Sequence, residues 1–191
     1  MGLFGWRSAK PAAPPDDGPR IDRDAVAEDV RPDDFIAHAG TPDHPGLQWH
    51  GILLNAPRRL VITPRRPDPL LGGGTGPCAV IWGYCMLPCR AEDRGVDHRE
   101  QVTLVAVDVA RKQVFSGRVL PRPTFGSVHV APPPGVVARP PAGLSAGGPF
   151  NPDLVRICGI PVQDADYEVF ARADGWRSNV LDVQVRLPPH S

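Results

Sequence analysis

Charge of one sign is what this sequence lacks most clearly. Its 21 basic and 21 acidic side chains cancel to a formal net charge of zero, so composition gives no electrostatic reason to expect nucleic acid or an anionic membrane as a partner. Lysine is scarce, since Lys10 and Lys112 are the only lysines among the 21 basic residues. An arginine pair such as Arg58-Arg59 therefore indicates a charged strand edge that discourages aggregation, rather than a phosphate-binding stripe.

Long apolar runs are also missing. No stretch approaches the about 18 residues that a membrane span needs, and none near residue 1 resembles the core of a signal peptide. Cysteine is limited to four residues in a chain of 191. These features predict a cytoplasmic protein with reduced thiols and no membrane partner.

The motifs of common enzyme and cofactor sites do not occur in the sequence. Gly72, Gly73 and Gly74 form no phosphate-binding loop, because no Lys-Ser or Lys-Thr follows them. There is no G-x-S-x-G nucleophile elbow. We therefore expect a protein that is not an enzyme, with no catalytic or metal-binding residues, no cofactor and no small-molecule substrate.

Cys85 and Cys89, with His98 nearby, carry the alternative hypothesis. Their spacing is that of half a zinc site, but a second pair is absent because Cys158 stands alone. Cys89 with Asp97 and His98 is also a possible nucleophilic dyad. We interpret Cys85 as a small buried hydrophobe and Cys89 as a free thiol in a charged loop. The alternative is an enzyme or metal-binding domain that uses the loop from Cys85 to His98.

The clearest structural pattern lies in residues 164–187. From Tyr167 onward, one set of side chains is apolar and the intervening set is mostly polar, and the same alternation recurs in residues 181–187. Period-2 alternation is typical of half-buried β-strands, because successive side chains point to opposite faces. Between the two segments, Asp174-Gly175 supplies turn chemistry. This stretch predicts a β-hairpin.

The predicted hairpin resembles the end of an immunoglobulin-like or fibronectin-III-like sandwich. Tyr167 begins the penultimate strand after a corner at Ile160-Pro161, which is similar to the tyrosine corner of these domains. Ser178-Asn179 leads into a final strand, and Val169 stands where antibody domains have a cysteine. The resemblance implies a sandwich without that disulfide and a binding or structural role. It also implies that the Tyr167 hydroxyl bonds the upstream backbone, so that Tyr167→Phe costs about 1 kcal/mol or more.

The rest of the chain from residue 47 predicts further short strands, at residues 48–54, 58–63, 78–87, 101–109, 113–120, 125–130 and 153–158. The break at Pro57 suits a first strand that switches sheets midway. Residues 121–152 predict a proline-rich linker, and no helix is expected outside the N-terminal arm. The fold class is therefore all-β: an Ig-like antiparallel β-sandwich of about seven to nine strands over residues 47–188.

Residues 1–46 predict a disordered, proline-rich arm. Nine acidic side chains against five basic ones make it acidic, and it lacks the apolar surface that would offset its ordering entropy. Phe4 and Trp6 form an apolar tip on this arm. The tip is either a frayed terminus or a short linear motif that docks in a groove of a partner.

Aromatic side chains carry the predicted function. Phe170 lies on the polar face of its strand and Trp176 lies close by in the turn, so the two are candidates for an exposed patch. The predicted interaction surface comprises Phe4, Trp6, Phe170 and Trp176. We expect a non-catalytic Ig-like module for protein–protein interaction or structural assembly, whose partner is another protein or a second copy. Phe170→Ala is expected to spare the fold and to weaken association.

Overall fold

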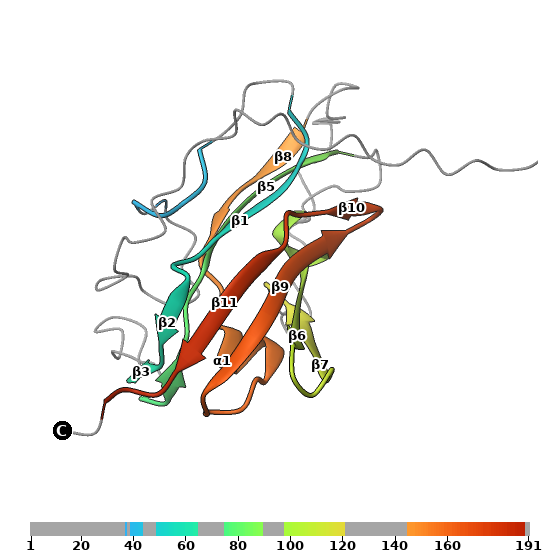
Figure 1. The fold of residues 1–191 in the computed structure, drawn as a ribbon. Coiled ribbons are helices and arrows are strands. Elements are labelled where there is room, and N and C mark those ends of the chain that lie inside the picture. The colour runs from blue at the N-terminus through green and yellow to red at the C-terminus, as the bar shows by residue number, and fades with distance from the viewer. Residues whose placement is uncertain are drawn as a thin grey trace, which may run out of the picture.

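The computed structural model describes residues 37, 39–43, 49–64, 75–89, 98–120 and 145–189. These residues are mostly β-strand, arranged in a three-stranded, a six-stranded and a two-stranded sheet (Figure 1). The predicted all-β class is confirmed at this level. Phe4, Trp6 and the predicted strand at residues 125–130 lie outside the described residues.

The three-stranded sheet has β5 (Trp82–Pro88) at its centre, between β1 (Gly51–Asn55) and β8 (Ser145–Phe150), and both pairings are antiparallel. Gly83 permits close packing here, because a Cβ at this position would overlap the Phe150 ring. β8 shows that the prediction of a continuous linker over residues 121–152 is wrong for its last part. Its two glycines and its proline disfavour a strand, and pairing with β5 overrides that preference.

The predicted strand at residues 78–87 is divided in two. β4 (Pro77–Cys78) pairs with β3 (Thr63–Pro64) in the two-stranded sheet, whereas β5 begins only at Trp82. Between them, Val80 forms an isolated antiparallel bridge with Asp153. Trp82, the first residue of β5, is 3% exposed.

The six-stranded sheet has the order β2-β11-β9-β6-β7, with β10 attached to β9. Its strands are β2 (Arg59–Val61), β6 (Thr103–Asp108), β7 (Val114–Arg118), β9 (Ala165–Ala173), β10 (Trp176–Arg177) and β11 (Leu181–Arg186). β2 runs parallel to β11, and the other neighbouring pairs are antiparallel. Because β1 and β2 flank Pro57 and belong to different sheets, the chain switches sheets there as predicted.

The two long strands of the predicted hairpin alternate between buried and exposed positions, as expected. Their buried positions are Tyr167, Val169, Ala171, Ala173, Leu181, Val183 and Val185. Glu168 and Asp182, opposite each other on the outer face, are exposed. The hairpin of β6 and β7 also forms in the predicted place. Strict alternation therefore identified β9 and β11 correctly.

The prediction of a strand at residues 153–158 and of no helix outside the arm is wrong. α1 (Leu154–Cys158) is a helix, and η1 (His98–Gln101) is a short 3-10 helix. Asp153 is the N-cap of α1, because its side chain accepts a hydrogen bond from the Val155 N–H, and Gly159 ends the helix with φ 72°. These caps satisfy helix ends in a segment whose apolar content alone fits a strand equally well.

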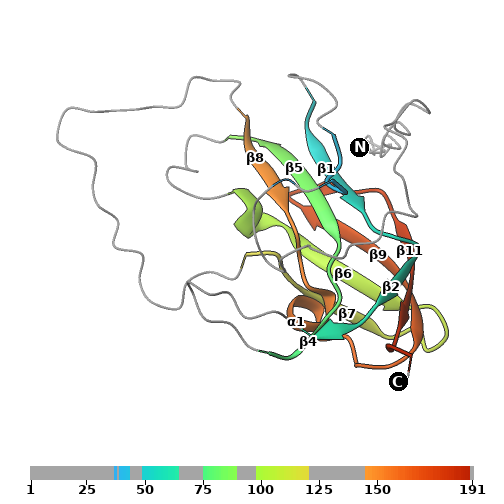
Figure 2. The ribbon, with the colours of Figure 1, turned by 90° about the vertical axis from the view of Figure 1, so that its left-hand side faces the viewer.

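One hydrophobic cluster joins the two larger sheets. It includes Leu54 and Phe150 from the three-stranded sheet, and Leu104 and Val169 from the six-stranded sheet. Figure 2 shows the strands of the two sheets as separate layers. α1 packs against β6 and β7 and adds Leu154 to the same cluster. The described part of the chain thus encloses its apolar side chains between two sheets and one helix.

A short N-terminal segment, residues 39–43, packs on the three-stranded sheet. Asn55 Nδ2 donates a hydrogen bond of 2.7 Å to the Gly40 carbonyl. A Cβ at Gly40 would overlap the Trp82 indole, so only glycine fits this approach. Pro42 is also buried. These residues lie within the predicted arm, and the boundary at residue 47 stays a prediction.

Candidate functional site

The candidate site lies at one end of the molecule, where β1 and β8 begin and β5 ends. The turn between β9 and β10 reaches the same end (Figure 1). A small hollow there is lined by Leu87, Pro88, Gln101, Asp174 and Trp176. Three segments that are distant in the sequence therefore contribute side chains to this hollow.

Trp176 is placed at this hollow by the predicted turn. Asp174 and Gly175 adopt left-handed backbone conformations, with φ 41° and 85°, which is the geometry that an Asp-Gly hairpin turn favours. Trp176 pairs with Ala173 on β9 and is 38% exposed. Its indole lies 6.4 Å from the His50 ring, centroid to centroid.

His50 also contacts Ser145, through Nε2 and Oγ. No sequence motif singles out this pair. The two residues are far apart in the chain, and no spacing rule connects them. They meet because β1 and β8 both begin at this end, on either side of β5.

Phe170 does not lie on the same surface as Trp176. Paired residues on antiparallel strands point to the same face, so Trp176 shares the face of Ala173, which is buried. Phe170 occupies the opposite face, beside Val105. The Arg177 guanidinium carbon lies 4.1 Å from the centroid of the Phe170 ring. The two predicted surface aromatics therefore belong to separate faces, and a cation–π contact covers Phe170 in part.

Cys89 and His98 come together beside the hollow. Cys89 follows β5 directly, and His98 begins η1. Cys89 Sγ lies 3.4 Å from His98 Nε2. His98 is 3% exposed, and its Nδ1 has no hydrogen-bond partner among the described residues. Asp97, which was predicted to lie with Cys89 and His98, is outside the described residues.

The four cysteines all belong to the described residues, and none forms a disulfide. Cys85 is fully buried, in agreement with its interpretation as a small hydrophobe. Burial, and secondly the nearby Asp153 charge, raise the pKa of the Cys158 thiol to about 12. Within the described ranges, no group of three or more His, Cys, Asp or Glu side chains could hold a metal ion.

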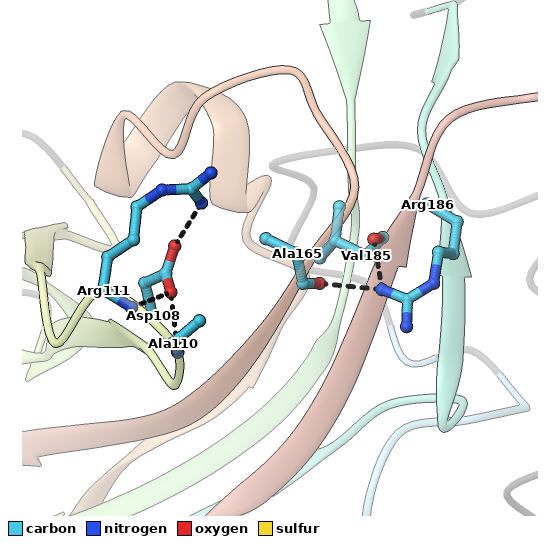
Figure 3. A network of polar contacts seen from close by, with 6 residues as sticks. All are labelled: Asp108, Ala110, Arg111, Ala165, Val185 and Arg186. Atoms are coloured by element: carbon cyan, nitrogen blue, oxygen red, sulfur yellow. Dashed lines mark hydrogen bonds and ion pairs between the residues drawn. The ribbon is translucent and has the colours of Figure 1, made fainter.

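A polar network fixes the opposite end of the six-stranded sheet (Figure 3). Asp108 Oδ1 accepts hydrogen bonds from the N–H groups of Ala110 and Arg111, at 2.9 and 2.8 Å, and Oδ2 pairs with the Arg111 guanidinium at 2.9 Å. The hydrogen bond from the Arg111 N–H is the largest cause that holds the pKa of Asp108 below its ordinary value, despite burial. Arg186 donates to the carbonyls of Ala165 and Val185.

The Tyr167 hydroxyl does not form the predicted tyrosine corner. The hydroxyl oxygen is buried and has no hydrogen-bond partner in the part of the chain that the structure describes. Its ring packs edge-on against Phe115, at 6.2 Å between centroids. Burial, and secondly the Asp108 charge, raise the pKa of Tyr167. Asp108 is also the residue of β6 that pairs with Tyr167, so the charged neighbour of the hydroxyl belongs to β6 and not to the corner before β9.

The comparisons with known proteins leave the site to be judged on its geometry. No protein-family model matches the chain, and neither a curated protein nor a solved structure matches it. None of the helices in the described ranges is long and apolar enough to cross a membrane. The exposed Trp176 beside the hollow and the Cys89–His98 pair are the two features that invite a functional interpretation.

Proposed function

We propose that the chain is a non-catalytic Ig-like β-sandwich module, over residues 47–188, that acts in protein–protein interaction or structural assembly. The binding role rests on one observation: the aromatic side chain of Trp176 stays 38% exposed at the rim of a hollow. The order of the strands supports the Ig-like fold that holds this side chain in place. The partner is another protein or a second copy of the chain.

The strand order supports the Ig-like part of the proposal. In Ig domains, strands A, B and E form one sheet, and strands G, F and C form the other, to which variable-type domains add C′. Here β1, β5 and β8 take the places of A, B and E, and β11, β9, β6 and β7 take those of G, F, C and C′. β2 continues the first strand into the second sheet, beside β11. The support comes from this order, since the corner hydrogen bond and the disulfide are both missing.

The chemistry of the hollow supports the binding role. Leu87 and Pro88 give it an apolar side, whereas Gln101 and Asp174 give it polar atoms. Interfaces combine an apolar centre with a polar rim, and tryptophan is enriched among the residues whose truncation weakens binding most. An apolar side chain of a partner therefore fits against Trp176. The predicted tip with Phe4 and Trp6, from a neighbouring copy, is one such occupant.

The experiment compares Trp176→Ala with Val162→Ala. Val162 is 47% exposed in the connection between α1 and β9, away from the hollow, and serves as the matched control. Self-association is measured by analytical ultracentrifugation, and other partners by quantitative affinity capture from the native cell, with and without residues 1–46. Trp176→Ala should weaken the association by about tenfold or more, the scale of a hot-spot residue.

Three outcomes are distinguishable: docking at the hollow, no role for the hollow, and docking on the arm. Loss of association in Trp176→Ala, with Val162→Ala unchanged and both variants folded, supports the hollow as the docking surface. Equal association in both variants and in wild type overturns it. If only the removal of residues 1–46 abolishes association, the partner docks on the arm instead.

A further inference from the structure

The pairing of Cys89 with His98 is built into the fold rather than produced by two mobile surface side chains. η1, which begins with His98, contacts both β5 and β8. Arg99 Nη1 donates to the Pro149 carbonyl at 3.3 Å, and the Val102 N–H bonds the Arg99 carbonyl at 3.1 Å. These contacts hold the His98 ring in a nearly closed environment, with Nε2 aimed at the sulfur.

The unpartnered Nδ1 of His98 indicates which nitrogen carries the proton. If Nε2 accepted the thiol hydrogen, a neutral ring would carry its own hydrogen on Nδ1, where no acceptor is present among the described residues. A buried N–H without an acceptor is rarer and more costly than a buried lone pair without a donor. A hydrogen on Nε2, donated to Cys89 Sγ, is the arrangement that leaves no buried ring N–H without an acceptor among the described residues. A thiolate accepts such a hydrogen bond better than a thiol.

We propose that Cys89 is a nucleophilic thiol that undergoes exchange with disulfides, and that His98 is the positioning residue that stabilises its thiolate. Cys89 loses its proton to water, because a second proton on His98 would occupy the buried Nδ1. The Cys89 sulfur then attacks one sulfur of a disulfide, and a new S–S bond forms as the old one breaks. The released thiolate takes up a proton from water. The disulfide is the oxidant, and Cys89 ends as a mixed disulfide.

The other three cysteines supply an internal comparison. Cys85, Cys78 and Cys158 are 0, 5 and 7% exposed, whereas Cys89 is only half-buried. Attack on a disulfide needs an accessible thiolate. The Cys158 thiol is neither accessible nor readily ionised, since it is buried and its burial raises its pKa to about 12. In the folded protein, exchange is therefore confined to Cys89.

The test uses the full chain in its native state and glutathione disulfide as the probe. Peptide mapping by mass spectrometry shows which cysteine carries glutathione, and the rate is followed over a pH series beside N-acetylcysteine as an unassisted thiol. His98→Leu removes the donor, whereas His98→Gln keeps an N–H at the end of the side chain. We expect modification of Cys89 only, and a rate near neutral pH that falls about threefold to tenfold in His98→Leu, because this variant loses the hydrogen bond to the attacking sulfur. His98→Gln should recover much of that rate.

Three outcomes would overturn the proposal or one of its parts. Cys89 that reacts no faster than N-acetylcysteine overturns it, and this comparison needs no variant. Modification of another cysteine in the folded protein, checked with Cys89→Ser, overturns the confinement to Cys89. If His98→Gln is as slow as His98→Leu while circular dichroism shows both folded, His98 acts as a base and its role as a donor is overturned.

Discussion

Tyr167 illustrates, at the scale of single residues, how a side chain can be placed correctly by sequence while its chemistry is not. Its burial and its facing follow from the alternation of β9. The hydrogen-bond partner of its hydroxyl does not follow from the alternation, because it depends on which loop lies beside the hydroxyl in space. The sequence pointed to the corner before β9, whereas in the structure β6 brings Asp108 opposite Tyr167. The same limit applies to His98, whose contact with Cys89 was one of several arrangements that the sequence permitted.

Tyr167→Phe should therefore leave the free energy of unfolding unchanged or raise it by up to about 1 kcal/mol, since it removes an unpaired buried hydroxyl and keeps the ring. This is the reverse of the expectation from the corner. The midpoint of urea denaturation measures the effect. A loss of more than about 1 kcal/mol would show that the hydroxyl has a hydrogen-bond partner beyond the described residues.

At the scale of elements, the sequence predicted the strands that are apolar or that alternate, and missed β8, whose residues show neither pattern. β9, β11, β6 and β7 carry a period-2 pattern or a clear turn, and their existence could be predicted. β8 has glycine and proline in place of β-branched residues, and only the neighbouring β5 makes it a strand. For α1, the apolar run was too short to decide between helix and strand. Asp153 and Gly159 were the available signals, as an N-cap and a helix-ending glycine.

The hairpin of β6 and β7 gives a prediction about pH. The folded state lowers the pKa of Asp108, chiefly through the Arg111 N–H. A group with a lowered pKa contributes stability that is complete above its unfolded-state pKa, near 3.8, and that disappears as the pH falls through the folded-state value. Asp108→Asn should therefore be less stable than wild type at neutral pH, and the difference should narrow as the pH falls below 3.8.

Thermal unfolding followed over a pH series measures this difference. Asp182→Asn, at an exposed position on β11, is the matched control and should match wild type at neutral pH. If the difference in stability between Asp108→Asn and wild type stays constant down to acid pH, the Asp108 charge does not contribute to stability. The stabilisation would then come from the shape of the turn alone.

At the scale of the whole molecule, the site is a product of topology. Trp176, His50 and Ser145 meet because three chain segments reach one end of the two larger sheets. No motif in the sequence connects these residues, so their proximity could not be predicted. The sheet switch at Pro57 could be predicted, because a proline between two β-like segments is a local signal. Which sheet each half joins depends on long-range pairing.

The facing of the two sheets can be tested by a new cross-link. Cys85 is fully buried at the centre of the three-stranded sheet, and Val169 is fully buried on β9. If the strands correspond to B and F of an Ig domain, these positions face each other as the cysteines of antibody domains do. Val169→Cys should then form a disulfide with Cys85 under mild oxidation, detected as a loss of two thiol groups. Ala106→Cys, buried on the neighbouring strand β6, should not. Two persistent thiols in Val169→Cys would count against the Ig-like arrangement.

The parallel pairing of β2 with β11 also decides how the domain responds to stretching. The chain enters β1 at one end of the molecule and leaves β11 at the other (Figure 1). Tension between these points slides β2 and β11 past each other along their length, because parallel neighbours are then pulled in opposite directions. The Ile62 N–H to Arg186 carbonyl and Gln184 N–H to Arg58 carbonyl bonds, both 2.8 Å, carry the load together. We therefore expect this edge to resist stretching in shear, with its hydrogen bonds breaking together and not one at a time.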